Sequence, residues 1–265
     1  MTGTGTKDDP FIVDNWEDYI SINSTSKYVE FDQNSTNKII DFNEIQPEGF
    51  SKILYFPVTN FNGWTFRNFH STASTAIRIG MGTYENLIFE NFYFCPENTS
   101  NAYLFSSYGN GSKYFCNVVI SGQIQSVSTT TKFIDGCDFC ESSANIVVNS
   151  TGKFRSIYNG DIKNSEIVVD ISAENVDLCN NPIINSRISG KIQSDGTITA
   201  GSTKSAYNVF NIQSNQPIDY QGQGISVYNS DISQSVQSEN FLGCTDEQLR
   251  NAQYLYDLRF PIGVD

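Results

Sequence analysis

The sequence has few of the residues on which most catalytic and nucleic-acid-binding sites depend. Its 265 residues contain a single histidine, His70, and 16 lysines and arginines against 29 acidic residues, which gives a net charge of −13. The basic residues are scattered singly, and because phosphate binding needs clustered cations, nucleic acid is not expected as a partner. No Gly-x-Ser-x-Gly motif occurs, so the sequence predicts no nucleophilic triad around His70.

The sequence also lacks the segments that direct a chain into a membrane. It has no run of about 18 apolar residues, and Met1–Thr6 lacks the charged and apolar regions of a signal peptide. We therefore expect no membrane insertion, and folding in a cytoplasm. No calcium-loop motif is present, so neither a metal nor a cofactor is expected.

The six cysteines show no established metal or redox pattern. Cys137 and Cys140 form a C-x-x-C motif, but no second pair and no histidine lies at the spacing that zinc requires. Cys95, Cys116 and Cys137 recur at the same interval, which predicts that they stack as small buried residues at one position of successive coils. A disulfide or a metal remains the alternative. Free buried thiols favour synthesis in a reducing cytoplasm.

What the sequence does contain is a repeated phrase, Asn-Ser-x-Ile, which begins at Asn164 and returns at Asn185 and Asn229. A period in the low twenties with short strands is typical of a solenoid. The chain has 28 isoleucines and 8 leucines, and β-branched residues favour strands. No helical connections suit a doubly wound fold, and no regular hairpin turns suit a sandwich.

The pattern therefore predicts an all-β fold, a right-handed, single-stranded parallel β-helix of roughly eight coils. In such a coil an asparagine at a bend can hold a left-handed backbone and bond its amide to the next coil. The asparagines expected to do so are Asn68, Asn91, Asn164, Asn185 and Asn229.

Both ends of the chain differ from the repeat, which divides it into a leader and capping segment (1–50), a β-helix (51–240) and a C-terminal helix and tail (241–265). Asp14 is expected to cap a first helix, and Thr245, with Gln248 three residues on, a last one. The last helix either covers the final coil or docks on another subunit. The candidate assembly residues are Leu249, Tyr254, Leu255, Leu258 and Phe260.

Sugar chemistry would require two carboxylates about 5 to 10 Å apart. The candidates are Asp138, Asp161, Asp177, Glu166 and Asp231. Glu166 aligns with Arg187 one repeat later, which favours a ladder of opposite charges over an acid and base pair. We expect no catalytic residues in this chain.

Tyrosines on an exposed face could stack on sugar rings. The candidate binding residues are Tyr84, Tyr108 and Tyr158, and Tyr93, Tyr207 and Tyr228 are further tyrosines of this kind. Most aromatic residues in a pattern of this type belong to the core, so the alternative for each is a structural role.

The run from Gly5 to Tyr19, GTKDDPFIVDNWEDY, resembles the opening of pectate-lyase-like β-helix proteins from phages and prophages of gut bacteria. The runs Ile39–Asn43 and Asn62–Phe69 are similar to their first coils, so that the likeness covers about the first 95 residues. It implies a pectin-lyase-like solenoid and a virion component, namely a fibre, spike or decoration protein, often trimeric. No fixed catalytic set comes with the resemblance.

The expected function is thus a non-enzymatic structural protein of a bacteriophage particle, made in the host cytoplasm. Its expected partners are other virion proteins, sister chains in a trimer and a host-surface glycan. The alternatives are a tailspike-type lyase or hydrolase that cleaves polysaccharide, and a bacterial polysaccharide-binding module.

Overall fold

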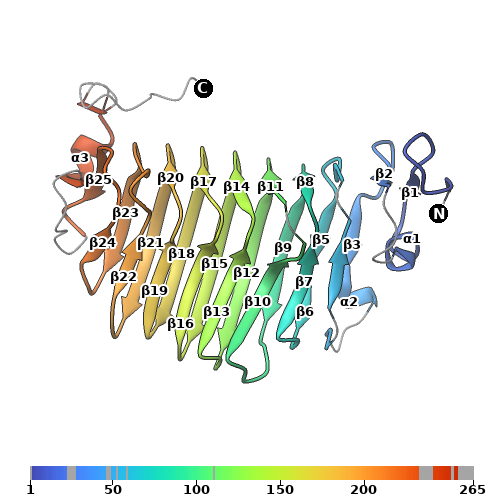
Figure 1. Cartoon of the computed structure of the whole chain (residues 1–265), viewed down its shortest axis with the longest axis horizontal. Helices are drawn as coiled ribbons and strands as arrows, with labels where there is room; N and C mark the ends of the chain where they lie inside the picture. The colour runs from blue at the N-terminus through green and yellow to red at the C-terminus, as the bar shows by residue number, and fades with distance from the viewer. Residues whose placement is uncertain are drawn as a thin grey trace.

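A computed structural model describes residues 2–22, 28–45, 49–51, 53–57, 59–109, 111–232, 241–251 and 254–255. Three parallel sheets run along the long axis, with residues 2–22 and residues 241–251 at opposite ends of the stack (Figure 1). Each turn of the chain adds one strand to a sheet beside the strand of the previous turn. The all-β parallel solenoid predicted from the repeat is confirmed.

The longest sheet has eleven strands. They are β3 (Ile39–Asp41), β5 (Thr65–Arg67), β6 (His70–Ser71), β9 (Ile88–Phe94), β12 (Val119–Ser126), β15 (Ser143–Ser150), β18 (Glu166–Ala173), β21 (Arg187–Ser194), β23 (Val209–Ser214), β25 (Ser226–Asn229) and β26 (Phe241–Cys244). Its outer face carries the expected opposite charges, because Glu166 and Arg187 are register partners.

The second and third sheets have eight and five strands. The eight are β4 (Leu54–Phe56), β7 (Thr75–Ile79), β10 (Asn101–Ser107), β13 (Thr130–Asp135), β16 (Lys153–Tyr158), β19 (Asn175–Cys179), β22 (Ile198–Ala200) and β24 (Ile218–Tyr220). The five are β8 (Gly82–Glu85), β11 (Lys113–Cys116), β14 (Asp138–Cys140), β17 (Ile162–Lys163) and β20 (Ile183–Ile184).

The core consists of apolar columns that follow the strand register. One inward column of the longest sheet contains Phe66, Phe89, Ile120, Ala144, Ile167, Ile188 and Phe210, all of them buried. Alternation along each strand points these residues inward while their neighbours face outward. The hydrophobic side chains of one coil thus pack mainly on those of the next coil.

A residue with a left-handed backbone stands in the turn before six successive strands of the longest sheet, β9, β12, β15, β18, β21 and β23. These residues, in register, are Asn86, Asn117, Glu141, Asn164, Asn185 and Tyr207, all at positive φ. The Nδ2 of Asn185 donates a hydrogen bond to Oδ1 of Asn164 at 3.0 Å. Asn68 and Asn91 have the same backbone sign, and the Asn91 Nδ2 donates to Asn68 Oδ1 at 2.6 Å. The predicted asparagine ladder is confirmed at these four positions.

The serine of the repeated phrase has its own role inside the turn. The backbone N–H of Ser142 donates to Oγ of Ser165 at 3.2 Å, and that of Ser165 donates to Oγ of Ser186 at 3.2 Å. The N–H of Ser186 then donates to Oδ1 of Asn208 at 3.1 Å. All four residues are buried, so the ladder satisfies backbone donors that would otherwise be unpaired in the core.

The third copy of the phrase, at Asn229, is out of register and lacks the left-handed backbone, so that part of its prediction was wrong, but its Nδ2 does donate to Oδ1 of Asn211 on the neighbouring coil at 2.8 Å. Asn229 ends β25 and pairs with Cys244, and Ser226 takes the ladder position, accepting from the N–H of Asn208 at 3.1 Å.

The prediction that Cys95, Cys116 and Cys137 stack at one position of successive coils was also wrong. Cys116 is the register partner of Cys140, not of Cys137, because the coils differ in length and an equal spacing does not mark an equal position.

Short elements cover the N-terminal end of the core (Figure 1). The strands β1 (Phe11–Val13) and β2 (Val29–Phe31) pair in parallel, and helices α1 (Trp16–Ser21) and α2 (Phe42–Ile45) lie beside the first coils. Asn15, rather than Asp14, caps α1, accepting a hydrogen bond from the N–H of Asp18 at 2.9 Å. The buried Tyr19 of α1 places its ring 5.1 Å from that of Phe66.

The C-terminal end is covered by α3 (Asp246–Leu249), for which the predicted capping box is confirmed. Thr245 Oγ1 accepts from the N–H of Gln248 at 3.2 Å, and Gln248 Oε1 accepts from the N–H of Thr245 at 2.8 Å.

Candidate functional site

The predicted sugar-stacking tyrosines lie in different environments. Tyr84 is fully buried and its Oη accepts from the N–H of Gly80 at 2.6 Å, so its prediction as a binding residue was wrong. The residue takes an inward position of β8, where its ring packs on Phe115. Tyr108 is 45% exposed and lies edge-on to Tyr55, and Tyr158 is half-buried in β16.

The other tyrosines considered from sequence are dispersed. Tyr93 donates from its Oη to Oε1 of Gln125 at 2.8 Å, and Tyr228 packs against the core residue Phe241. Tyr207 occupies the left-handed turn before β23. Only Tyr158 belongs to a group in which aromatic and charged side chains meet.

That group lies on the eight-stranded sheet. Tyr103, Lys132, Arg155 and Asp177 are register partners on β10, β13, β16 and β19, and Asp135 and Tyr158 are partners beside them. We call these six residues the Lys132 cluster. Phe133 and Ile134 are both buried, so the alternation of β13 breaks between them, and Lys132 and Asp135 can meet on one side of the strand.

The Lys132 side chain is unusually buried for a lysine, with only 9% of its surface exposed. Its Nζ lies 4.8 Å from the ring centroid of Tyr103 and 4.3 Å from that of Tyr158. The same ammonium group is 3.3 Å from Oδ2 of Asp135. The two rings and one carboxylate therefore compensate a charge that would otherwise be costly to remove from water.

Arg155 is held in a different way. Its Cζ lies 4.0 Å from the ring centroid of Tyr158, while its Nε is 3.8 Å from Oδ2 of Asp177, which is too far for a hydrogen bond. This buried Nε has no hydrogen-bond partner among the described residues. The guanidinium thus stacks on a tyrosine while a donor stays unpaired, a condition that costs free energy in the absence of a ligand.

Asp177, one of the candidate carboxylates, is the residue of the Lys132 cluster on β19, next to Arg155 in register. Burial raises its pKa, whereas the positive charges of Lys153 and Arg155 and a hydrogen bond from Thr199 act in the opposite direction. The expectation that basic residues are scattered singly was wrong here, because Lys132, Lys153 and Arg155 come from two adjacent strands of the sheet.

The other candidate carboxylates occupy three places. Asp138 and Asp161 lie on neighbouring coils, where the N–H of Asp161 donates to Oδ1 of Asp138 at 2.9 Å. Lys163 Nζ lies between them, 2.8 Å from Asp161 and 3.9 Å from Asp138. Glu166 is exposed opposite Arg187, and Asp231 accepts from the N–H of Asp246 at the start of α3.

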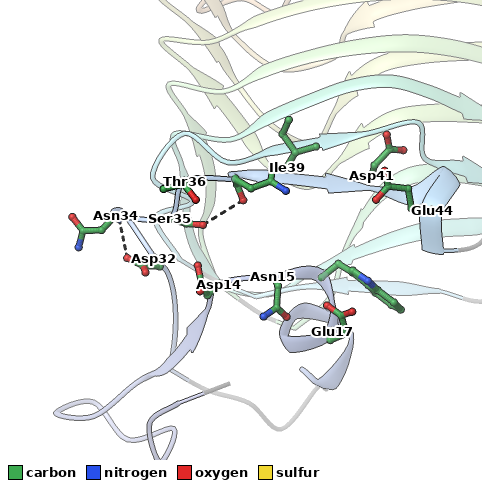
Figure 2. A pocket seen from close by; sticks show the side chains of 12 residues that line it. Asp14, Asn15, Glu17, Asp32, Asn34, Ser35, Thr36, Ile39, Asp41 and Glu44 are labelled. Atoms are coloured by element: carbon green, nitrogen blue, oxygen red, sulfur yellow. Dashed lines mark hydrogen bonds between the residues drawn. The ribbon is translucent and has the colours of Figure 1, made fainter.

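A cavity of about 530 Å³ lies at the N-terminal end, between α1, the loop after β2 and α2. Figure 2 shows the five carboxylates that line it, which come from the segment before α1, from α1, from the loop after β2, from β3 and from α2. They are Asp14, Glu17, Asp32, Asp41 and Glu44. No lysine or arginine lines the cavity, and Trp16 and Ile39 supply apolar surface.

The predicted assembly residues divide into two groups. Leu249, Tyr254 and Leu255 pack against Val227 and Cys244 of the last coil, which is what the capping alternative predicts. Leu258 and Phe260 lie outside the described residues. Docking on another subunit stays a prediction.

Within the described ranges, no three histidine, cysteine or carboxylate side chains gather as a metal site would require. None of the helices in the part of the chain that the structure describes is long and apolar enough to cross a membrane. The chain matches no protein-family model, no curated protein and no solved structure.

Sequence reasoning missed Tyr103, Lys132, Asp135 and Arg155. Register partners of the longest sheet are 21 residues apart at Ser165 and Ser186 but 31 apart at Asn86 and Asn117. With such uneven coils, no fixed period aligns the four residues of the row. The only local signal was an outward tyrosine, Tyr158, three residues after the strand cation Arg155.

Proposed function

We propose that the chain is a bacteriophage virion protein, a fibre, spike or decoration component, that binds a host-surface glycan without cleaving it. In this proposal the solenoid is a right-handed β-helix of the pectin-lyase-like kind. The observation that carries the binding function is the Lys132 cluster, which joins two tyrosine rings to stacked cations on one sheet. The N-terminal resemblance supports the assignment to a particle.

The cluster suits a sugar for two physical reasons. The rings of Tyr103 and Tyr158 lie on the coils on either side of Lys132 and hold its ammonium group, and a ring face that no cation covers can receive the C–H groups of a sugar ring. A guanidinium donates hydrogen bonds in a planar fork, and that of Arg155, which stacks on Tyr158 and whose Nε is not hydrogen-bonded to Asp177, can direct such bonds to sugar oxygens. In a chain of net charge −13, this local group of cations also reduces repulsion of an acidic glycan.

Binding is tested by titrating the purified chain with capsular and surface polysaccharides of candidate host bacteria. We expect Tyr158→Ala and Arg155→Lys to weaken binding about tenfold, a loss of about 1.4 kcal/mol. Tyr93→Ala is the matched control, since it removes a half-buried tyrosine from the longest sheet. Thermal melts verify that each variant is folded. Equal losses in the control and the cluster variants, or no glycan bound at all, would refute a binding role for the cluster.

The particle assignment needs separate measurements. Mass spectrometry of purified phage particles should detect the chain in stoichiometric amounts. Light scattering should give about three times 29.6 kDa, because we propose a trimer in contact with other virion proteins. Detection in bacterial fractions and not in particles would favour the bacterial polysaccharide-binding module instead.

Polysaccharide cleavage is a second candidate, favoured by one observation. Asp138 and Asp161 lie on neighbouring coils, about 4.8 Å apart along the stack. Side chains at this coil spacing can bring two carboxyl groups near the separation of about 5 to 5.5 Å that retaining hydrolases use. Release of new reducing ends or unsaturated products, abolished by Asp161→Asn, would replace the non-enzymatic proposal.

A further inference from the structure

Two cysteines on adjacent coils face each other in the five-stranded sheet. Cys116 ends β11 and Cys140 ends β14, and the two residues are register partners. Both side chains are half-buried, and their thiols interact with each other. Register partners on neighbouring parallel strands are about 4.8 Å apart, within the Cα separation of about 4.4 to 6.8 Å that a disulfide spans.

The remaining cysteines have other surroundings. The buried Cys137 and Cys179 donate from Sγ to the carbonyl oxygens of Asp138 and Gly160. Cys244 packs with Val227, and its Sγ lies 3.9 Å from Oη of Tyr254. Among the described residues, Cys116 and Cys140 are thus the two cysteines that register brings together. The two cysteines of the C-x-x-C motif do not lie together in this way, since Cys137 is in the core while Cys140 is half-exposed.

We propose that Cys116 and Cys140 are a site of reversible oxidation, where a low-molecular-weight disulfide converts two thiols into a cross-link between adjacent coils. One cysteine loses its proton, and its thiolate attacks a sulfur of the small disulfide and expels one small thiolate. The second cysteine loses its proton and attacks the mixed disulfide, expelling the other. The protein is oxidised by two electrons, and the small disulfide is reduced to two thiols.

The surroundings of the pair make this reaction slow at neutral pH. Burial raises the pKa of Cys116, with Glu85, Glu141 and Asp138 adding to the effect, while the hydrogen bond with Cys140 opposes it. Burial, Cys116 and Asp138 raise the pKa of Cys140 to about 11, and Lys163 on β17 acts against them. Because the thiolate is the attacking species, the rate should increase with pH toward this value.

The cross-link would join two coils in the middle of the solenoid after the chain has folded. Its proposed timing rests on the proposed function: a particle protein folds in a reducing cytoplasm and later meets an oxidising exterior. The oxidation chemistry itself does not depend on that function. It requires only the isolated chain and a small disulfide.

The test treats the purified, reduced chain with oxidised glutathione at about pH 9, above the usual thiol pKa. Peptide mapping should then find one disulfide, between Cys116 and Cys140, with the loss of two hydrogens and no bound glutathione. The melting temperature should increase by about 5 to 10 °C and return to its original value with dithiothreitol. A different pair, persistent glutathione on both cysteines, or no cross-link would overturn the proposal.

Variants separate the cross-link from a general effect of oxidation. Cys116→Ser should leave a stable glutathione adduct on Cys140 and abolish the increase in melting temperature, and Cys140→Ser should do the same for Cys116. Cys95→Ser is the matched control and should cross-link like the parent chain, because Cys95 has no cysteine as a register partner in the described strands. If the chain is absent from particles but forms this bond, the function fails and the inference stands.

Discussion

At the scale of single residues, the left-handed turns before six strands of the longest sheet, β9 to β23, determine how the next coil begins. Asn164 has a φ of 48° and accepts a hydrogen bond from Asn185. Alanine in this conformation costs about 1 to 2 kcal/mol, and the interaction between coils is lost as well. We therefore expect Asn164→Ala to lower the free energy of unfolding by about 2 kcal/mol, measured by urea denaturation.

Asn164→Gly is the matched control, because glycine adopts positive φ freely but cannot form the side-chain hydrogen bond. It should cost about half as much as alanine. Equal decreases in the free energy of unfolding for the two variants would mean that the positive φ at this turn contributes little to stability. The sequence predicted this turn because asparagine tolerates the left-handed region, and that preference is local. The burial of Tyr84 was not predictable in this way, since it depends on which face of β8 meets the core.

At the scale of elements, α1 covers the first coils, and its most deeply buried side chain is that of Tyr19. Tyr19 is 2% exposed and its ring contacts those of Phe31, Phe56 and Phe66, yet its hydroxyl has no hydrogen-bond partner among the described residues. Burial raises the pKa of this hydroxyl well above its usual value, so it stays protonated. Tyr19→Ala should lower the free energy of unfolding by about 3 to 5 kcal/mol through the cavity it leaves.

Tyr19→Phe keeps the ring contacts and removes only the unpaired hydroxyl. It should leave stability unchanged or increase it by about 1 kcal/mol, in the same chemical-denaturation measurement. A large loss in the phenylalanine variant would show that the hydroxyl has a partner, and a small loss with alanine would mean that α1 does not protect the core. The helix itself was predictable from its cap and apolar spacing, although its cap is Asn15.

The Lys132 cluster shows why elements could be predicted better than the site. Strands reveal themselves by alternation and β-branched residues within a short window. The site depends instead on which residues of β10, β13, β16 and β19 align, and the coils between these strands differ in length. Strand positions are local information, whereas register between coils is set by the lengths of turns and by core packing.

At the scale of the whole molecule, stability should vary along the stack, because each coil contacts mainly its neighbours. Ile167 is 1% exposed in β18, which pairs with β15 on one side and β21 on the other. Ile167→Ala should cost about 2 to 5 kcal/mol locally. We therefore expect faster amide hydrogen exchange in β15, β18 and β21, with little change in β3 and β5 at the N-terminal end.

Val168→Ala is the control for this measurement, because Val168 is on the same strand but half-exposed, and its loss should alter exchange little. In the parent chain, the central strands should exchange more slowly than β3 and β26, which lie at the ends of the longest sheet's strand order. An increase of equal size in every strand of the Ile167→Ala variant would contradict neighbour-limited stability. It would instead mean that the solenoid unfolds as one cooperative unit, so that a destabilising substitution in any coil would lower the stability of the Lys132 cluster by the same amount.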